Sequence, residues 1–167
     1  MPLNSVLATF REQSWNFTEV PGRENVIESA FEAHHTRVPL HVQAFPELNA
    51  VSVVSRSGVP VEAAHLPALC ELVLRANQAL TVGNFEIDFD HGHTVLYRAT
   101  NLFPLSSPPD NGIIAGLVHS AVAEIDRLTP SLSIVAQTPP DELPTLDLRA
   151  LLAREDLLPP TPDKDTP

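Results

Sequence analysis

The chain has 167 residues, 43% of them hydrophobic, which suits one globular domain with a core of its own. Its formal net charge of −11 argues against a nucleic acid or an anionic membrane as the main partner, because both attract basic patches. No stretch approaches the roughly 18 apolar residues of a membrane span, and no signal peptide is evident at the N-terminus, so we expect a cytoplasmic protein.

The N-terminal residues predict a short amphipathic helix followed by an extended segment. Apolar residues recur at helical spacing between about residues 3 and 13, namely Leu3, Val6, Leu7 and Phe10. Trp15 and Phe17 then stand in a short extended piece that ends at the Pro21-Gly22 turn signal. We expect Trp15 to plug the core beside the helix, as large aromatic side chains usually do, rather than to stack on a ligand.

Three strand-like segments follow, over residues 26–34, 38–45 and 50–56. Apolar and polar residues alternate along them, as with Ile27 and Phe31 against Glu28 in the first segment. Pro39 has no N–H, so it should lie where the sheet needs no donor. Because the connections are short, we expect an antiparallel meander.

Helical spacing takes over after a break at residues 57–60. The regular helix should begin near His65, because Pro67 is tolerated only in the first turn. The apolar stripe predicted to face the core consists of Leu66, Leu69, Cys70, Val73, Leu74, Asn77 and Leu80. Cys70, the single cysteine, excludes an internal disulfide and is interpreted as a small buried hydrophobe rather than a catalytic thiol. Gly83 stands where a C-cap glycine would end the helix.

A β-hairpin is the most strongly patterned part of the chain. Apolar residues alternate with polar ones on both arms, first Phe85, Ile87 and Phe89 and then Val95 and Tyr97. Only a loop with an odd number of residues brings these two sets together, since a slip of one residue turns every side chain over. We therefore predict the loop Asp90-His91-Gly92, with Gly92 left-handed. The face that carries Glu86, Asp88 and Arg98 should be solvated.

A third helix begins after a proline-rich loop, with Asp110 or Asn111 as its cap. Its predicted apolar stripe comprises Ile113, Ile114, Leu117, Val118, Ala121, Val122, Ile125 and Leu128. We expect the pair Thr129-Pro130 to restart or kink the helix, which ends near Ala136. The predicted order α-β-β-β-α-β-β-α defines an α+β domain over residues 1–136: a single antiparallel sheet with helices packed on one face.

Residues 137–167 differ in composition from the rest of the chain. They contain seven prolines and seven acidic residues against three basic ones, which favours an extended, poorly ordered tail. Leu148, Leu151 and Leu152 nevertheless have helical spacing, so a short helix near residues 146–155 is possible. Such a helix is too short to be stable alone and would dock on the domain or on a partner.

Histidines are the candidate metal ligands of this sequence, and the weak candidates are His34, His35, His41, His91 and His93. Two or three imidazoles on adjacent strands can bind zinc or copper. Polar residues are ordinary at a hairpin tip, however, so we favour no metal site. No nucleophile elbow, phosphate-binding glycine loop or H-E-x-x-H helix is present either. We therefore expect no catalytic residues and no cofactor.

Four stretches resemble the YbjN-domain family, in particular its cyanobacterial-type members. They are "NVIESAFEAHHTRVPLHVQAFPELNAVSVVSRS", "RANQALTVGNFEIDFDHG", "LYRATNLF" and "VAEIDRLTPSLSIV". The resemblance covers about residues 3–136 and leaves out the proline-rich tail. It implies a fold similar to the chaperones of type III secretion systems, which are small acidic homodimers that bind a client protein. YbjN relatives are described as sensory-transduction or stress regulators of bacteria with no established reaction.

Two functional hypotheses follow from these features. The first is a non-enzymatic protein–protein interaction module, chaperone-like or regulatory, that forms a homodimer through the third-helix stripe or a strand edge and takes a protein client at an edge or groove. The alternative is a His-based metal-binding protein or metal-dependent enzyme. A third possibility is that the piece from Leu148 to Leu152 folds back over the groove of the domain and regulates access to it.

Overall fold

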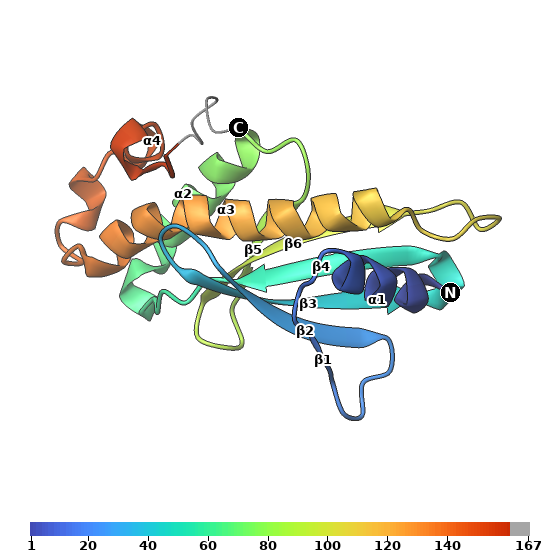
Figure 1. The fold of residues 1–167 in the computed structure, drawn as a ribbon. Helices are drawn as coiled ribbons and strands as arrows, with labels where there is room; N and C mark the ends of the chain where they lie inside the picture. The colour runs from blue at the N-terminus through green and yellow to red at the C-terminus, as the bar shows by residue number, and fades with distance from the viewer. Residues whose placement is uncertain (161–167) are drawn as a thin grey trace.

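The computed structural model describes residues 1–160, which form one mixed α+β unit (Figure 1). Its helices and strands are α1 (Pro2–Glu12), β1 (Thr18–Glu19), β2 (Val26–Glu32), β3 (Arg37–Phe45), β4 (Ala50–Arg56), α2 (Leu66–Gln78), β5 (Asn84–Asp88), β6 (Thr94–Leu102), α3 (Asn111–Gln137) and α4 (Leu148–Leu152). Short 3-10 turns flank several of them, including η1 (Pro46–Leu48) after β3. No helix among these residues has the length and apolarity needed to cross a bilayer.

All six strands form one open antiparallel sheet in the order β1-β2-β3-β4-β6-β5. The predicted fold class, meander and hairpin are confirmed. The structure adds β1, a two-residue strand in which Thr18 and Glu19 pair with Glu28 and Ile27. This short strand lies in the segment predicted only as extended, where two residues are too few to show a period of two.

The helices cover one face of the sheet, and the core lies between them. In Figure 1, α1 lies in front of β3 and β4 while α3 runs along the sheet. Ser55 of β4 donates a hydrogen bond to the carbonyl oxygen of Ala121 in α3 (2.7 Å), which fixes the face that α3 covers. Trp15 is partly buried and packs edge-to-face on Phe10 and Phe31 beside α1, against the core as predicted.

The third helix is longer and more continuous than the sequence predicts. Asp110 caps it by accepting a hydrogen bond from the backbone N–H of Ile113 (2.9 Å). The predicted restart or kink at Thr129-Pro130 is wrong, because α3 runs through Pro130 to Gln137. The hydroxyl of Thr129 donates to the carbonyl of Ile125 (2.7 Å), one turn earlier, and buried packing on both sides of the proline holds the helix together.

Packing also corrects the predicted stripe of α2. Leu69 and Val73 face the core as expected, together with Leu72 and Ala76, which the predicted stripe omitted. Leu74, by contrast, is 66% exposed. The buried arc is therefore rotated, because α2 is covered on two sides: it contacts β5 and α3, and α4 packs on it as well.

The hairpin of β5 and β6 has the predicted register, with Phe85 opposite Tyr97 and Ile87 opposite Val95. The loop is longer than predicted, because the ladder ends at Asp88 and Thr94. Gly92 is left-handed as expected (φ +77°), and His93 is left-handed as well (φ +54°). The alternation grouped Phe89 with Phe85 and Ile87 as part of the core, but Phe89 lies beyond the end of the ladder and is 60% exposed, so this prediction is wrong.

Gly83 does not cap α2, which ends at Gln78 with Ala79 as its C-cap. It lies farther along the loop to β5, in a left-handed conformation (φ +69°). A β-carbon at this position would overlap the hydroxyl of Tyr97 and lie 2.6 Å from the carbonyl oxygen of Arg98. The glycine therefore allows the loop to cross β6 closely enough for Tyr97 to donate a hydrogen bond to the Val82 carbonyl.

The segment after α3 folds back on the helices instead of extending into solvent as expected from its composition. Leu148 and Leu151 of α4 are buried against the core, and α4 contacts α2 and α3. His65, buried at the start of α2, lies 2.9 Å (Nε2) from the carbonyl oxygen of Thr138. The buried leucines of α4 thus hold this segment on the domain despite its proline-rich composition. The rest of the predicted tail, residues 161–167, lies outside the described residues.

Candidate functional site

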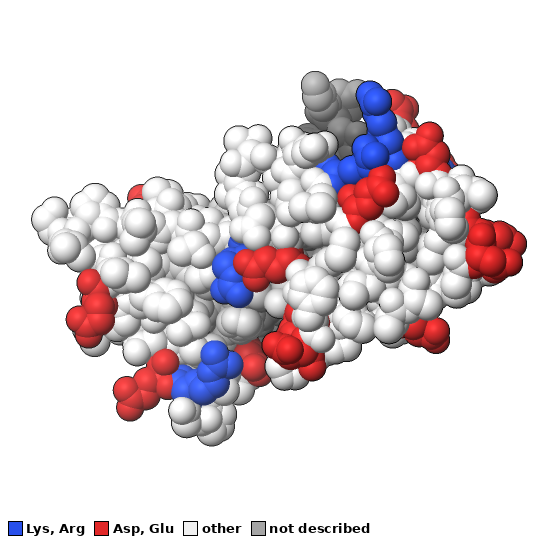
Figure 2. Space-filling view, turned by 180° about the vertical axis from the view of Figure 1, so that it is seen from behind, with Lys and Arg blue, Asp and Glu red and all other residues white. Residues whose placement is uncertain are grey.

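Within residues 1–160, no helix packs on one face of the sheet, and we call it the uncovered face. Alternate residues of each strand point to it, namely Glu28 and Ala30 of β2, Pro39 and His41 of β3, Val54 and Arg56 of β4, Leu96, Arg98, Thr100 and Leu102 of β6, and Glu86 of β5. Figure 2 views the molecule from behind, where uncharged side chains fill most of the surface and one pair of opposite charges lies near the middle. Leu102, at the end of β6, is 69% exposed.

A shallow hollow of about 320 Å³ lies on this face across the central strands. Its lining includes Glu28, Pro39, His41, Val54, Arg56 and Leu96. The strand register brings these residues together, because His41 lies between Glu28 on β2 and Val54 on β4, and Arg56 lies opposite Leu96 on β6. Apolar, basic and acidic side chains thus share one depression.

Positive charge surrounds His41, which is half-buried in the hollow. Burial is the main cause that lowers the pKa of His41, and the charges of Arg23 and Arg98 lower it further. Glu28 opposes them from the neighbouring strand, while Arg56 adds to the lowering. Burial and a locally positive environment therefore both disfavour the charged form of the imidazole.

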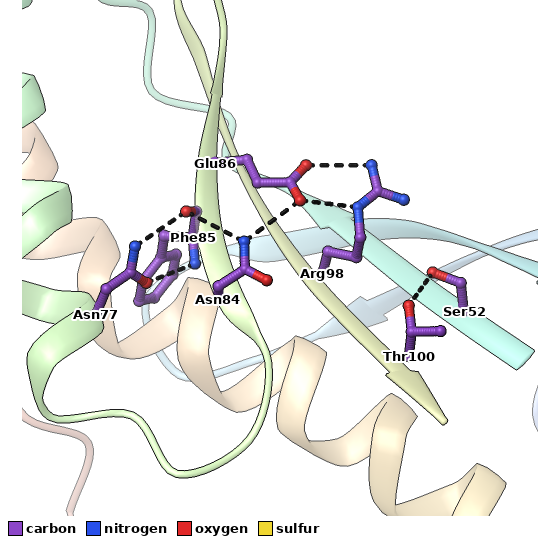
Figure 3. Close-up of polar contacts among 7 residues, drawn as sticks. All are labelled: Ser52, Asn77, Asn84, Phe85, Glu86, Arg98 and Thr100. Carbon is purple, nitrogen blue, oxygen red and sulfur yellow. Dashed lines mark hydrogen bonds and ion pairs between the residues drawn. The ribbon is translucent and has the colours of Figure 1, made fainter. Parts of the chain in front are cut away.

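A row of polar side chains lies across β4, β6 and β5 on this face (Figure 3). Arg98 donates two hydrogen bonds to the carboxylate of Glu86, from Nε (2.9 Å) and from a terminal nitrogen (3.1 Å). These bonds lower the pKa of Glu86. The hydroxyl of Thr100 donates to that of Ser52 on the adjacent strand (2.8 Å). This row confirms that the hairpin face predicted to be solvated lies outside the core.

The backbone of β5 and the end of β6 differ in the hydrogen-bond partners on their outer sides. The side-chain amide of Asn77, in α2, accepts a hydrogen bond from the N–H of Phe85 (2.7 Å) and donates one to its carbonyl (3.1 Å), so it stands in for a further strand beside β5 (Figure 3). Farther along, β6 pairs with β4 as far as Leu102 but with β5 only as far as Arg98. Residues 99–102 therefore have a strand neighbour on one side alone within the described sheet.

The histidines proposed as metal ligands are dispersed. His34 and His35 touch edge-to-face in the turn between β2 and β3, with ring centroids 4.5 Å apart. His35 is engaged by Asp126, which is 3% exposed on α3: the carboxylate accepts from the backbone N–H of His35 (2.7 Å) and of Thr36 (3.2 Å) and lies 3.3 Å from the His35 ring. This cluster anchors the turn to α3.

The other three candidates lie in two separate places. His91 and His93 are in the hairpin loop, where the His91 ring lies 3.0 Å from the carboxylate of Asp88. That contact lowers the pKa of Asp88. His41 lies apart from them in the hollow. Within residues 1–160, no three histidine, cysteine or acidic side chains are grouped closely enough to hold a metal ion.

The sequence patterns did not predict the positions of two residues at this site. The spacing of Asn77 placed it in the apolar stripe of α2, whereas its amide caps β5. Arg56 was predicted only as the last residue of a strand, but its place at the hollow depends on pairing with β6, some 40 residues later in the chain. The alternation that put Arg98 on the solvated face was the one usable signal, and it was correct.

These observations define a class: an α+β domain in which, over the described residues 1–160, helices cover one face of an open antiparallel sheet and no helix covers the other. Among solved structures, the chain has the fold of YbjN from E. coli, which is proposed to be a transcription regulator. The TM-score is 0.57 at 10% sequence identity, over 80% of this chain and 87% of that one. The sequence matches no protein-family model and no curated protein. The likeness is therefore one of fold.

Proposed function

We propose that this chain is a non-enzymatic protein-binding module with a regulatory role, and that its partner docks on the uncovered face. One observation carries the proposal: three helices cover one face of the sheet, while the opposite face displays apolar side chains among charged ones. The fold of YbjN supports the regulatory part of the proposal, since that protein is proposed to be a transcription regulator. The dispersed histidines favour this function over metal chemistry.

The unpaired half of β6 supports a second part of the proposal, that the module is a homodimer. The carbonyl of Val95 and the N–H of Phe103 form hydrogen bonds on the side of β6 that faces β4. Backbone groups alternate in direction along a strand, so the even-numbered residues of β6 direct theirs away from β4. The backbone of Thr100 thus faces the open side, where an antiparallel strand of a second copy can pair.

Light scattering tests the dimer. The proposal predicts twice the mass of the 18.2 kDa chain at micromolar concentration, and a monomer for Thr100→Pro, which removes a backbone donor that the chain's own sheet leaves unused. A monomeric wild type would refute the homodimer but would not affect the proposal that a partner docks on the uncovered face.

A pair of matched leucines tests the docking face. Leu102 on the uncovered face and Leu74 on α2 are similarly exposed, at 69% and 66%. Affinity capture from a native lysate is carried out with the wild type, Leu102→Asp and Leu74→Asp, and the captured proteins are identified by mass spectrometry. A partner should be retained by Leu74→Asp and lost with Leu102→Asp; the opposite pattern would place the interface elsewhere.

A further inference from the structure

The hollow on the uncovered face collects positive charge in a chain whose net charge is −11. Arg56 reaches it from β4 and His41 from β3. Arg23, in the turn between β1 and β2, and Arg98, on β6, both act electrostatically on His41. Four of the chain's positively charged or protonatable groups thus converge on one part of the sheet.

These groups differ in how far they are already paired. Arg98 is engaged by the carboxylate of Glu86. Within residues 1–160, neither Arg23 nor Arg56 forms an ion pair with a carboxylate, and Arg56 is exposed. Glu28 is the one acidic side chain that lines the hollow, and it lies across from His41. Arg56 therefore has its charge available to a partner.

The rest of the lining is apolar. Pro39, Val54 and Leu96 come from three adjacent strands and surround the basic groups. A volume of about 320 Å³ accommodates a few side chains of an extended segment and is small for a large cofactor. The chemistry that fits is a carboxylate next to aliphatic side chains.

We propose that this hollow binds an acidic peptide segment of the partner protein. A glutamate or aspartate carboxylate of the segment pairs with Arg56 and with the protonated form of His41. Neighbouring aliphatic side chains of the segment lie on Pro39, Val54 and Leu96. This inference rests on the proposed function and specifies the chemistry of the partner. Charge complementarity selects this occupant, since Arg56 lines the hollow and three arginines act on His41 against one glutamate.

Fluorescence anisotropy with a defined probe tests the inference. The probe is a labelled peptide of about eight residues in which leucine alternates with glutamate, and its counterparts carry glutamine or lysine in place of glutamate. Arg56→Gln removes the charge at the hollow. Arg11→Gln is the matched control, because Arg11 is also exposed but lies on α1, over the other face, and its loss changes the net charge equally.

The full-length protein should bind the glutamate peptide saturably, and Arg56→Gln should weaken this binding about tenfold or more. Arg11→Gln should change it less than about twofold. The glutamine and lysine peptides should bind much more weakly than the glutamate peptide. The inference is overturned by equal weakening in both variants, by preference for the lysine peptide, or by no saturation up to about 1 mM. Tighter binding of a single-stranded oligonucleotide would overturn it in favour of phosphate.

Proton linkage at His41 gives a second readout. The groups that act on this imidazole are Arg23, Glu28, Arg56 and Arg98, and a bound carboxylate opposes the three arginines and raises the pKa of His41. Binding should therefore strengthen as the pH falls from about 7.5 to 5.5, and His41→Gln should flatten this dependence. If the pH dependence of binding is unchanged in His41→Gln, the imidazole of His41 does not take part in binding.

The inference and the proposed function fail in different ways. If Leu102→Asp abolishes capture of a partner while Arg56→Gln leaves the capture unchanged, the uncovered face is the interface and the acidic chemistry is wrong. If Arg56→Gln abolishes peptide binding but neither leucine variant affects the captured partner, the hollow binds carboxylates and the protein interface lies elsewhere.

Discussion

Replacing Gly83 with alanine tests how closely the loop before β5 crosses the hairpin. The residue has φ +69°, a conformation that costs an alanine about 1–2 kcal/mol of folding free energy. Its β-carbon would also overlap the Tyr97 hydroxyl and lie 2.6 Å from the Arg98 carbonyl oxygen. Displacing the loop weakens the hydrogen bond from Tyr97 to Val82, at a cost of about 1 kcal/mol. We expect a total loss of about 2–4 kcal/mol in the free energy of unfolding.

Gly22 provides the matched control. It is left-handed as well (φ +76°), but a β-carbon there would meet nothing within 4 Å. Gly22→Ala should therefore cost only the conformational part, about 1–2 kcal/mol. Urea unfolding of the three proteins, analysed by linear extrapolation with comparable slopes, measures both losses.

A double variant separates the side-chain contact from the backbone strain. Tyr97→Phe removes the hydroxyl that the new β-carbon meets, so Gly83→Ala should cost less in that background than in the wild type. Equal losses for Gly83→Ala and Gly22→Ala, within about 0.5 kcal/mol, would refute the close crossing of the loop over β6.

Three further changes test other parts of the structure. Asp126→Ala leaves two backbone donors of the β2–β3 turn without their acceptor, so stability should fall by about 2 kcal/mol and amide exchange at His35 should accelerate. Leu151→Ala should cost about 2–4 kcal/mol in urea unfolding, because this side chain of α4 is buried; a neutral result would mean that α4 does not pack on the domain. Arg98 lowers the pKa of Glu86, so their pair stabilises the fold above the ordinary pKa of 4.5 and loses that contribution as the pH falls through the folded-state pKa. Glu86→Gln should therefore be less stable than wild type near neutral pH, by less than about 1 kcal/mol for this partly exposed pair, and the difference should vanish in acid.

Local patterns in the sequence predicted the elements and much of their pairing. Alternation along the hairpin determined its register, because only one alignment brings Phe85 and Tyr97 to the same face. The length of the loop was not predictable in the same way. The loop contains a left-handed residue at His93, a conformation that few residues other than glycine adopt, and Phe89 lies outside the strand in this longer loop.

Contacts between distant parts of the chain were beyond the sequence patterns. Asp126 and His35 are 91 positions apart and meet only because α3 crosses the end of the β2–β3 turn. Asn77 has the spacing of a buried helical residue, and spacing alone does not distinguish an apolar contact from an amide that caps a strand. The proline content of the C-terminal segment indicated an extended chain, whereas Leu148 and Leu151 bury enough apolar surface to hold it on α2.

Site-specific photo-crosslinking tests the central claim, that a protein partner docks on the uncovered face, most directly. A photoreactive amino acid is placed at Leu102, or at the equally exposed Leu74 on α2, and the full chain is irradiated in its native lysate. The account predicts a discrete cross-linked partner from Leu102 that competes with unlabelled wild type, and none from Leu74. The same partner cross-linked from Leu74 alone would contradict it.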